Sequence, residues 1–487
     1  MMANQNFTHI ETHRGCRPYN RMIFGQFLEH FHRQVYGGVF EPGSPLADAK
    51  GFRLDVIAAL RELRVPIVRW PGGCFVSAYH WARGIGHDRQ PSYDKAWRVE
   101  EPNTFGTDEF IEWCRLIGAE PYICTNAGTG SPEEMSDWVE YCNLDIGRWG
   151  RLRQANGYVK PHQVCYWSIG NENYGSWEMG AKTKEEWGRF VAESAKMMKR
   201  VDPSIKLLAA ALPDVDWTLN LLKQAGQYLD CVSIHGYWDP LWQKDEPSDY
   251  ATCMTRALEP EVAIRTTEQI IGVAGFEGQI GIAFDEWNLR GWHHPDGNSM
   301  RAIGARDRND INATYTMADA VFSAGFLNAC LRHPSVTMAN MAPVINARGP
   351  LFVHPKGIIK RATFHVLAMY ANLLEEYVAQ NWTSCEMFTH DGNSVPALDV
   401  VATCDAARER WAIAAVNRHP LVSIRSHIAF EGKSLTGTHQ MTTLSGDSPD
   451  ACNDVDHPER VVPVTKDVCV EQGMVDFPPH SVNIVKF

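Results

Sequence analysis

Short apolar runs recur along the first three quarters of the chain, and a polar loop and a helical stretch follow each of them. Near-continuous apolarity over a few residues is typical of parallel strands that are buried on both faces. We identify eight such runs: Met22–Leu28, Ile67–Trp70, Pro121–Thr125, Val164–Ile169, Lys206–Leu212, Cys231–His235, Ile280–Phe284 and Val336–Met341.

Amphipathic stretches separate these runs. In Phe52–Arg64 and Glu186–Val201 the apolar residues recur at the 3.6-residue period of an α-helix, and Pro203 ends the second stretch. Eight strands that alternate with helices predict an α/β fold, a (β/α)8 TIM barrel. We place this catalytic barrel at residues 20–375.

The pattern changes near residue 375, where short strand-like runs alternate with Gly, Pro, Asn and Asp. This spacing is typical of an all-β sandwich, which we assign to residues 376–487. Residues 1–19 contain one further strand candidate, Asn6–Ile10, as an additional part of the same sandwich. The C-terminal runs are Trp411–Asn417, Val422–Phe430, Gln440–Leu444, Arg460–Val464 and Ser481–Phe487.

Two glutamates follow buried strands of the predicted barrel, where such barrels place their active sites. Glu172 follows the fourth run, and Glu286 follows the seventh. Hydrolysis of a glycosidic bond needs two carboxyl groups across the anomeric carbon, either about 5–5.5 Å or about 6.5–9.5 Å apart. Each acid alone could be an ordinary loop residue, but the pair favours catalysis. Asp285 competes with Glu286, because alternation along a strand points one inward and the other into the wall.

Other strand ends and loops carry polar or aromatic groups that a sugar ring could contact. Three of them have structural alternatives: Glu29 could pair with Arg69, Cys74 could fill the core, and His235 could be a satisfied buried histidine. The candidates for substrate binding are Glu29, Arg69, Cys74, Trp97, Asn171, His235, Tyr237 and Asn346.

Composition narrows the partners. The chain has 487 residues and a net charge of −12, which argues against nucleic acid or an anionic membrane surface. Neither a secretory leader nor a long apolar span is evident, so we expect no membrane association. The 13 cysteines are scattered without CxxC pairs, which favours reduced thiols in a cytoplasmic protein.

Motifs for other chemistries are missing or weak. His30 and His32, and the pair His293 and His294, lack the HExxH spacing of a zinc site. The chain contains no GxGxxG, Walker or GxSxG motif. We therefore expect neither a metal nor an organic cofactor.

Six segments, in this order along the chain, resemble family 51 of the glycoside hydrolases, the α-L-arabinofuranosidases of clan A. The resemblance covers the whole barrel, whereas the C-terminal part is similar only in its all-β character. The segments are Phe24–His30, Val35–Gly43, Arg69–Phe75, Gly170–Glu172, Ser233–Tyr237 and Phe284–Asn288.

The resemblance implies Glu172 as acid/base and Glu286 as nucleophile of a retaining enzyme without a cofactor. It also implies that Trp97 forms a wall of the site. Similar proteins are often intracellular hexamers that act on short arabino- or arabinoxylo-oligosaccharides. The residues that the resemblance places against the furanose ring are Glu29, Cys74, Asn171 and Tyr237.

One departure concerns the loop after the eighth run. Pro343 stands where many family members have a glutamine that contacts the sugar, and proline cannot donate that hydrogen bond. Asn346 is an alternative partner for the hydroxyl. β-D-Galactofuranosides, β-D-xylosides and β-1,4-glucans therefore stay open as substrates, and a non-catalytic carbohydrate-binding barrel is the alternative from another class.

The expected mechanism is a double displacement. Glu286 attacks the anomeric carbon while Glu172 protonates the leaving oxygen, and Glu172 then activates the water that hydrolyses the glycosyl ester. Glu172 must begin protonated, and we expect the charge of Glu286 to raise its pKa.

Overall fold

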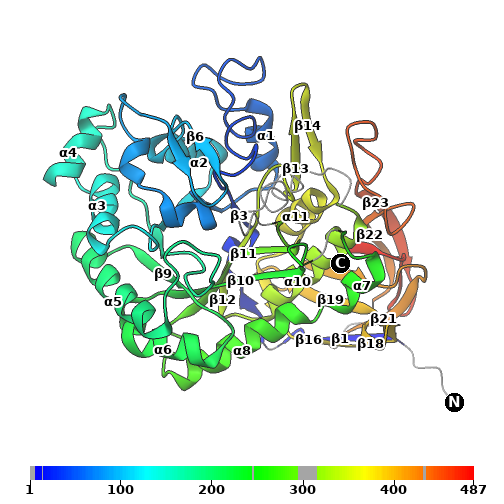
Figure 1. The fold of residues 1–487 in the computed structure, drawn as a ribbon. Coiled ribbons are helices and arrows are strands. Elements are labelled where there is room, and N and C mark those ends of the chain that lie inside the picture. Colours follow the sequence, from blue (N-terminus) through cyan, green and yellow to red (C-terminus); the bar gives the residue numbers. More distant parts are fainter. Residues whose placement is uncertain (1–5, 14, 244–245, 294–314, 432–434) are drawn as a thin grey trace.

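All eight apolar runs contribute a strand to one closed parallel barrel (Figure 1). The computed structural model describes residues 6–13, 15–243, 246–293, 315–431 and 435–487. Around the barrel the order is β10-β11-β12-β3-β4-β7-β8-β9, so the predicted TIM barrel is confirmed. The strands are β3 (Gly25–Phe27), β4 (Ile67–Trp70), β7 (Glu120–Thr125), β8 (Tyr166–Ile169), β9 (Lys206–Ala210), β10 (Cys231–Asp239), β11 (Gly281–Arg290) and β12 (Val336–Met341).

The first predicted strand, Met22–Leu28, is correct only over Gly25–Phe27. Arg21–Phe24 forms a 3-10 helix, η1, and only Gly25–Phe27 joins the barrel. The side chain of Asn20 accepts a hydrogen bond of 3.0 Å from the backbone N–H of Met22 and so caps this turn. Periodicity cannot separate a short apolar helix from a strand, and the local cap decides between them here.

Helices follow most of the strands and surround the barrel (Figure 1). α5 begins with a capping box, in which Thr183 accepts from the N–H of Glu186 and the Glu186 side chain accepts in return. No helix in the described residues is long and apolar enough to cross a membrane. The elements of this part are α1 (Leu54–Glu62), η2 (Cys74–Ala78), α2 (Thr107–Ile117), α3 (Pro132–Asn143), α4 (Gly147–Ala155), α5 (Lys184–Val201), α6 (Val215–Ala225), α7 (Tyr250–Thr255), α8 (Glu259–Val273), α10 (Met317–Arg332) and α11 (Ala362–Leu373).

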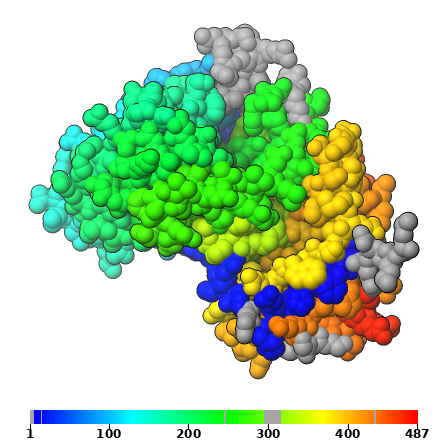
Figure 2. Space-filling model, turned by 90° about the horizontal axis from the view of Figure 1, so that it is seen from below, coloured from blue at the N-terminus to red at the C-terminus, as the bar shows by residue number. Residues whose placement is uncertain are grey.

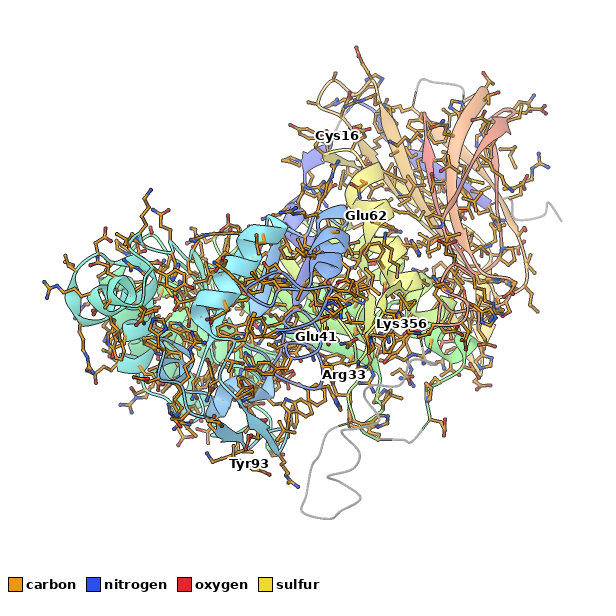
Figure 3. The ribbon with its side chains drawn as sticks, turned by 90° about the horizontal axis from the view of Figure 1, so that it is seen from above. Cys16, Arg33, Glu41, Glu62, Tyr93 and Lys356 are labelled. Atoms are coloured by element: carbon orange, nitrogen blue, oxygen red, sulfur yellow. The ribbon has the colours of Figure 1, made fainter. Side chains whose placement is uncertain are left out.

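Two sheets of the C-terminal part stand beside the barrel (Figure 3), and a separate hairpin pairs β17 (Met387–His390) with β18 (Asn393–Pro396). The larger contains β2 (Arg17–Pro18), β15 (Tyr377–Ala379), β19 (Leu398–Cys404), β20 (Trp411–Asn417), β25 (Ser481–Lys486), β22 (Gly437–Ser445) and β23 (Val464–Val470), in that order. The smaller contains β16 (Asn381–Ser384), β1 (Asn6–Ile10), β21 (Ile424–Phe430) and β24 (Met474–Phe477).

The N-terminal strand β1 is part of the smaller sheet. β1 lies parallel to β21 and antiparallel to β16, and Figure 2 shows this N-terminal segment, in blue, beside the orange C-terminal part.

The predicted run Arg460–Val464 is not a strand, because β23 begins only at Val464. Pro463 has no N–H to contribute to a ladder, so pairing begins after it.

Ion pairs join the barrel to the larger sheet. Asp399, on β19, lies 2.7 Å from a guanidinium nitrogen of Arg332 at the end of α10 and 2.7 Å from one of Arg418. Arg418 and Asp399 are buried. Burial raises the pKa of Asp399, but the charges of Arg332 and Arg418 outweigh it and hold the pKa below its usual value.

We expect Asp399→Ala to lower the free energy of unfolding by about 3 kcal/mol, because it leaves buried arginine charge without its partner. Urea unfolding at neutral pH measures this loss. Since the pKa of Asp399 is depressed in the folded state, its contribution is present above the unfolded pKa and is lost as the pH falls through the folded value. Arg460→Ala is the matched control, because the pair of Arg460 and Asp447 is exposed and contributes little. An equal loss in both variants would contradict the prediction.

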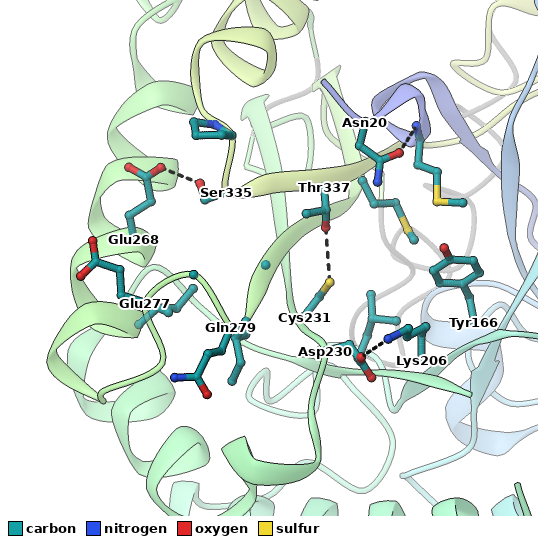
Figure 4. A pocket seen from close by; sticks show the side chains of 18 residues that line it. Asn20, Tyr166, Lys206, Asp230, Cys231, Glu268, Glu277, Gln279, Ser335 and Thr337 are labelled. Carbon is teal, nitrogen blue, oxygen red and sulfur yellow. Dashed lines mark hydrogen bonds and ion pairs between the residues drawn. The ribbon is translucent and has the colours of Figure 1, made fainter. Parts of the chain in front are cut away.

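The amino-terminal end of the barrel holds a pocket of about 760 Å³ (Figure 4). Cys231 and Lys206, the first residues of β10 and β9, line it. Lys206 pairs with Asp230 at 2.8 Å, and the hydroxyl of Ser335 donates to Glu268 at 2.5 Å. The acids Glu172 and Glu286 belong to the opposite end, because Glu172 follows β8 and Glu286 lies in the second half of β11.

Candidate active site

Glu172 and Glu286 lie in one site at the carboxyl end of the barrel. Glu172 is in the loop after β8 with a φ of +35°, a region that side chains other than glycine adopt rarely and often at functional sites. Glu286 lies in the second half of β11. His235, on β10, contacts both: its Nδ1 is 2.8 Å from Oε1 of Glu172 and 3.5 Å from Oε2 of Glu286. One side-chain oxygen of each glutamate and a ring nitrogen of His235 all lie within 4.8 Å of one another.

The charges of this cluster determine where its protons reside. Burial lowers the pKa of His235, but the charge of Glu286 and hydrogen bonds to Asp285 and Glu172 outweigh it and raise the pKa to about 10. Burial raises the pKa of Glu172, but the hydrogen bond and the charge of His235 outweigh it and lower the pKa. The expected rise in the pKa of Glu172 is therefore wrong, because the contact with His235 determines the net direction.

Arg69 neutralises the acids below the site. It is fully buried on β4, and it lies 2.7 Å from Oε2 of Glu286 and 3.4 Å from Oδ2 of Asp285. A third contact goes to Asn171, whose Oδ1 accepts a hydrogen bond of 2.7 Å. Among the described residues the ion pairs of Arg69 are thus with Glu286 and Asp285, and the alternative of a pair with Glu29 is not found.

Asp285 and Glu286 both face the barrel interior, although alternation predicts opposite directions. The pairing of β11 with β10 shifts register between Ser233 and His235, and its pairing with β12 shifts as well. Such a bulge turns consecutive side chains to the same side. Asp285 accepts hydrogen bonds of 2.6 Å from the hydroxyls of Tyr122 and Ser233. Burial raises its pKa, but the charge of Arg69 and the contact with His235 lower it to about 2.

Glu29, in the loop after β3, and Tyr237, on β10, belong to the same site. Glu29 is buried, and its Oε1 accepts hydrogen bonds of 2.9 Å from the indole of Trp97 and 3.1 Å from the N–H of Phe75. Burial and the charge of Glu286 raise its pKa to about 8 despite these donors. The hydroxyl of Tyr237 donates to Oε1 of Glu286 at 2.7 Å.

Aromatic rings form one wall of the site. Trp97 is buried and stacks on Phe31, with ring centroids 3.7 Å apart. Trp292 lies edge-on to Phe31 at 5.2 Å and to Tyr237 at 6.4 Å. The role of Trp97 as a wall residue for a sugar stays a prediction.

Cys74 and Asn346 differ in their surroundings. Cys74 begins η2, and its sulfur lies within 4.8 Å of a carboxyl oxygen of Glu172. Asn346 is fully buried, its amide N–H donates to the carbonyl of Arg33, and its Oδ1 accepts 2.7 Å from the N–H of Val353. The Asn346 side chain thus holds neighbouring loops, and its contact with a sugar stays a prediction.

Three further residues reach Glu172 from its own loop, and sequence reasoning did not single them out. The hydroxyl of Tyr174 lies 3.3 Å from Oε1 of Glu172, and the indole N–H of Trp177 donates to Oε2 at 2.9 Å. Glu178 is buried and accepts from the amide of Asn171 at 3.4 Å. Their only signal in the sequence is that they closely follow Glu172.

Among the described residues, two groups of side chains each bring three possible metal-binding atoms within 4.8 Å of one another. Metal ligation needs a neutral imidazole or a thiolate. Against the effect of burial, the charge of Glu286 and hydrogen bonds to Asp285 and Glu172 raise the pKa of His235 to about 10, and burial raises the pKa of the Cys74 thiol, so the surroundings disfavour both ligand forms. His30 is engaged with Glu101 at 2.9 Å, and His294 lies outside the described residues. The two groups are Glu172–His235–Glu286 and Cys74–Glu172–Glu178.

The sequence of the chain is similar to those of known proteins. The family model described as "Alpha-L-arabinofuranosidase 1 domain" matches residues 59–256, and "Alpha-L-arabinofuranosidase C-terminal domain" matches residues 285–481. A protein of Aspergillus clavatus named "Probable alpha-L-arabinofuranosidase C" is 34% identical over 100% of this chain and 98% of its own length. An "Intracellular exo-alpha-(1->5)-L-arabinofuranosidase" of Halalkalibacterium halodurans is 33% identical over 86% of this chain and 89% of its own.

The solved structures agree with this similarity. The α-L-arabinofuranosidase of Thermotoga maritima, solved as an arabinose complex, has a TM-score of 0.89 and 32% identity and covers 99% of both chains. A family 51 arabinofuranosidase of Thermotoga petrophila has a TM-score of 0.88 and 32% identity, over 99% of this chain and 100% of the other. The chain therefore belongs to family 51 of the glycoside hydrolases, the α-L-arabinofuranosidases.

Proposed function

We propose that the protein is a retaining, exo-acting α-L-arabinofuranosidase that releases terminal arabinofuranosyl units from arabino- and arabinoxylo-oligosaccharides. The observation that carries the mechanism is the separation of the two acids. Side-chain oxygens of Glu172 and Glu286 lie within 4.8 Å of each other, which supports double displacement rather than inversion, since inversion needs a gap of about 6.5–9.5 Å between the carboxyl groups for water.

Glu286 is the proposed nucleophile. Arg69 lies 2.7 Å from its Oε2 and Tyr237 donates to its Oε1 at 2.7 Å, so both oxygens are held while the residue is ionised. Its attack on the anomeric carbon forms a glycosyl ester and breaks the bond to the leaving oxygen. Asp285 lies beneath it and orients His235 and Arg69 without reaching the substrate.

Glu172 is the proposed acid/base, and His235 supplies its proton. In this proposal the proton starts on Nδ1 of His235, and its transfer across the 2.8 Å hydrogen bond gives the neutral Glu172 that protonates the leaving oxygen. Glu172 is then ionised and takes a proton from the water that hydrolyses the ester. Trp177, half-exposed beside Glu172, lies where the leaving group departs.

We expect His235→Gln to move the alkaline limb of the pH profile of kcat/KM to lower pH. The pair of His235 and Glu172 keeps one shared proton up to about pH 10, the pKa of His235. In the variant Glu172 must hold that proton alone. Its pKa rises once the neighbouring cation is gone, but it stays far below 10, so the active form is lost earlier as the pH increases.

Rates between pH 5 and 11 for wild type and variant measure this shift. His457→Gln is the control, because His457 is exposed on the C-terminal part. An alkaline limb that stays in place or moves upward in His235→Gln would show that His235 does not hold the shared proton.

A panel of aryl glycosides tests the substrate assignment. We expect the α-L-arabinofuranoside to be hydrolysed faster than the β-D-galactofuranoside, β-D-xyloside and β-D-glucoside, and its first product to keep the α-configuration by NMR. An arabinofuranoside that is the poorest substrate would refute the sugar assignment. An inverted first product would refute the retaining mechanism even if the sugar is right.

We also propose a division of the chain near residue 375, a cytoplasmic location and a homo-oligomeric state, with a hexamer expected from the family. The name of the Halalkalibacterium halodurans relative includes "Intracellular", which supports the location. Pairing of β1 with β16 and β21 supports inclusion of the N-terminal segment in the C-terminal part. Light scattering of the purified protein tests the assembly, and a monomeric mass would refute it.

A further inference from the structure

A third acid, Glu178, lies beside the proposed catalytic pair and takes no part in the two chemical steps. It is 4% exposed and follows Glu172 in the same loop. One of its carboxyl oxygens lies within 4.8 Å of both the sulfur of Cys74 and a carboxyl oxygen of Glu172. A buried acid at this place must either be neutralised or have a role.

The surroundings of Glu178 favour its neutral form. Glu286 has an arginine partner and Glu172 has a histidine, but no lysine, arginine or histidine of the described part forms an ion pair with Glu178. Its Oε1 is buried and makes no hydrogen bond of ordinary geometry within the described part of the chain. A buried carboxylate that has no cation and lies near two other carboxylates is unfavourable, so the proton stays on Glu178.

The pKa of Glu178 agrees with this geometry. Burial is the largest cause and raises it to about 8; the charges of Glu172 and Glu286 act in the same direction, whereas the nearby hydroxyl of Ser77 and thiol of Cys74 lower it without outweighing burial. Glu172 lies in the same loop as Glu178, Glu286 lies on β11, and Ser77 and Cys74 lie on η2.

A hydrogen-bond chain runs from Glu178 to the proposed nucleophile. Arg69 can only donate, so Oδ1 of Asn171 must face it, at 2.7 Å. This orientation directs Nδ2 of Asn171 to Oε2 of Glu178, at 3.4 Å. Arg69 in turn contacts Glu286 at 2.7 Å. The contact of Oδ1 with Arg69 and the contact of Nδ2 with Glu178 thus fix the orientation of the Asn171 amide together.

We propose that Glu178 is a positioning residue of the sugar site that acts as a neutral acid, fixing the Asn171 amide through its carbonyl oxygen and packing against Cys74. This inference rests on the proposed function, in which Asn171 and Cys74 contact the arabinofuranose ring. Sequence pattern does not point to it, because an acid in a loop is ordinarily solvated.

Two variants separate the neutral-acid role from its alternatives. Glu178→Gln keeps the shape and the carbonyl acceptor, so we expect kcat/KM to stay within about threefold of wild type. Glu178→Ala removes both, and we expect kcat/KM for the aryl arabinofuranoside to fall by about 10- to 100-fold because the sugar contacts are misplaced. The inhibition constant of L-arabinose should rise in the alanine variant and not in the glutamine variant.

The pH dependence provides an independent readout. Between pH 7 and pH 9.5 the KM of the wild type should rise more than that of Glu178→Gln, because only the wild type has a Glu178 carboxyl that ionises near Glu172, Glu286 and Cys74. Glu29 titrates in both proteins, so the difference between them reports Glu178 alone.

The outcomes are distinguishable. Wild-type kinetics in Glu178→Ala would refute a positioning role, and an equal loss in Glu178→Gln and Glu178→Ala would refute the neutral acid, since a carboxylate would then be required. If the wild type hydrolyses no arabinofuranoside, the proposed function fails. L-Arabinose binding by calorimetry then still compares the three proteins, and equal affinities would overturn the inference separately.

Discussion

Glu286→Ala is expected to reduce kcat on aryl α-L-arabinofuranosides by a factor on the order of 10⁴–10⁶, the scale at which a nucleophile is lost in other covalent mechanisms. The residue is 6% exposed and its oxygens contact Arg69, Tyr237 and His235. With the carboxylate gone, the neighbouring Asp285 does not replace it, because Tyr122, Ser233 and Arg69 hold both of its oxygens. Initial rates with a good leaving group measure the loss, because acid assistance is then least important.

Glu277→Ala is a control for Glu286→Ala. Glu277 is exposed and lines the pocket at the amino-terminal end of the barrel, so its removal should leave kcat in place. Azide added to Glu286→Ala should restore turnover and give an azide product of inverted configuration, since the small anion enters the space of the carboxylate. A variant that keeps a tenth of wild-type activity without azide would rule out Glu286 as the nucleophile.

The barrel could be predicted from the sequence because its signal is local. Each of the eight apolar runs overlaps a barrel strand, and Ile67–Trp70 and Val336–Met341 have the bounds of β4 and β12. Prediction failed where another local effect intervened. Asn20 caps a 3-10 turn before β3, and Pro463 delays the start of β23.

The candidate site could be predicted only in its residue types. Glu172 and Glu286 stand out because they follow buried strands, but the direction of Asp285 depends on a bulge between β10 and β11 that no periodicity reveals. The contact of His235 with Glu172 joins β10 to the loop after β8. It reverses the expected direction of the pKa shift of Glu172, because pKa values follow distances that the sequence does not contain.

The loss of activity in Glu172→Ala is expected to depend on the leaving group of the substrate. Acid/base catalysis contributes a factor of about 10²–10⁴, so kcat should fall by that amount because no base activates water in the second step. For a 2,4-dinitrophenyl leaving group, which departs without a proton, kcat/KM should change little. For an oligosaccharide, whose alkoxide is a poor leaving group, kcat/KM should fall by the full factor.

Azide separates this variant from Glu286→Ala. In Glu172→Ala the glycosyl ester on Glu286 still forms, so azide attacks it from the opposite face and the product keeps the substrate configuration. In this variant Nδ1 of His235 loses its partner Glu172 at 2.8 Å and keeps its contact with Glu286 at 3.5 Å, so we expect His235 to stay with the nucleophile and not to act as the base. If kcat/KM falls equally for dinitrophenyl and sugar leaving groups, Glu172 is not the acid/base and its role is structural.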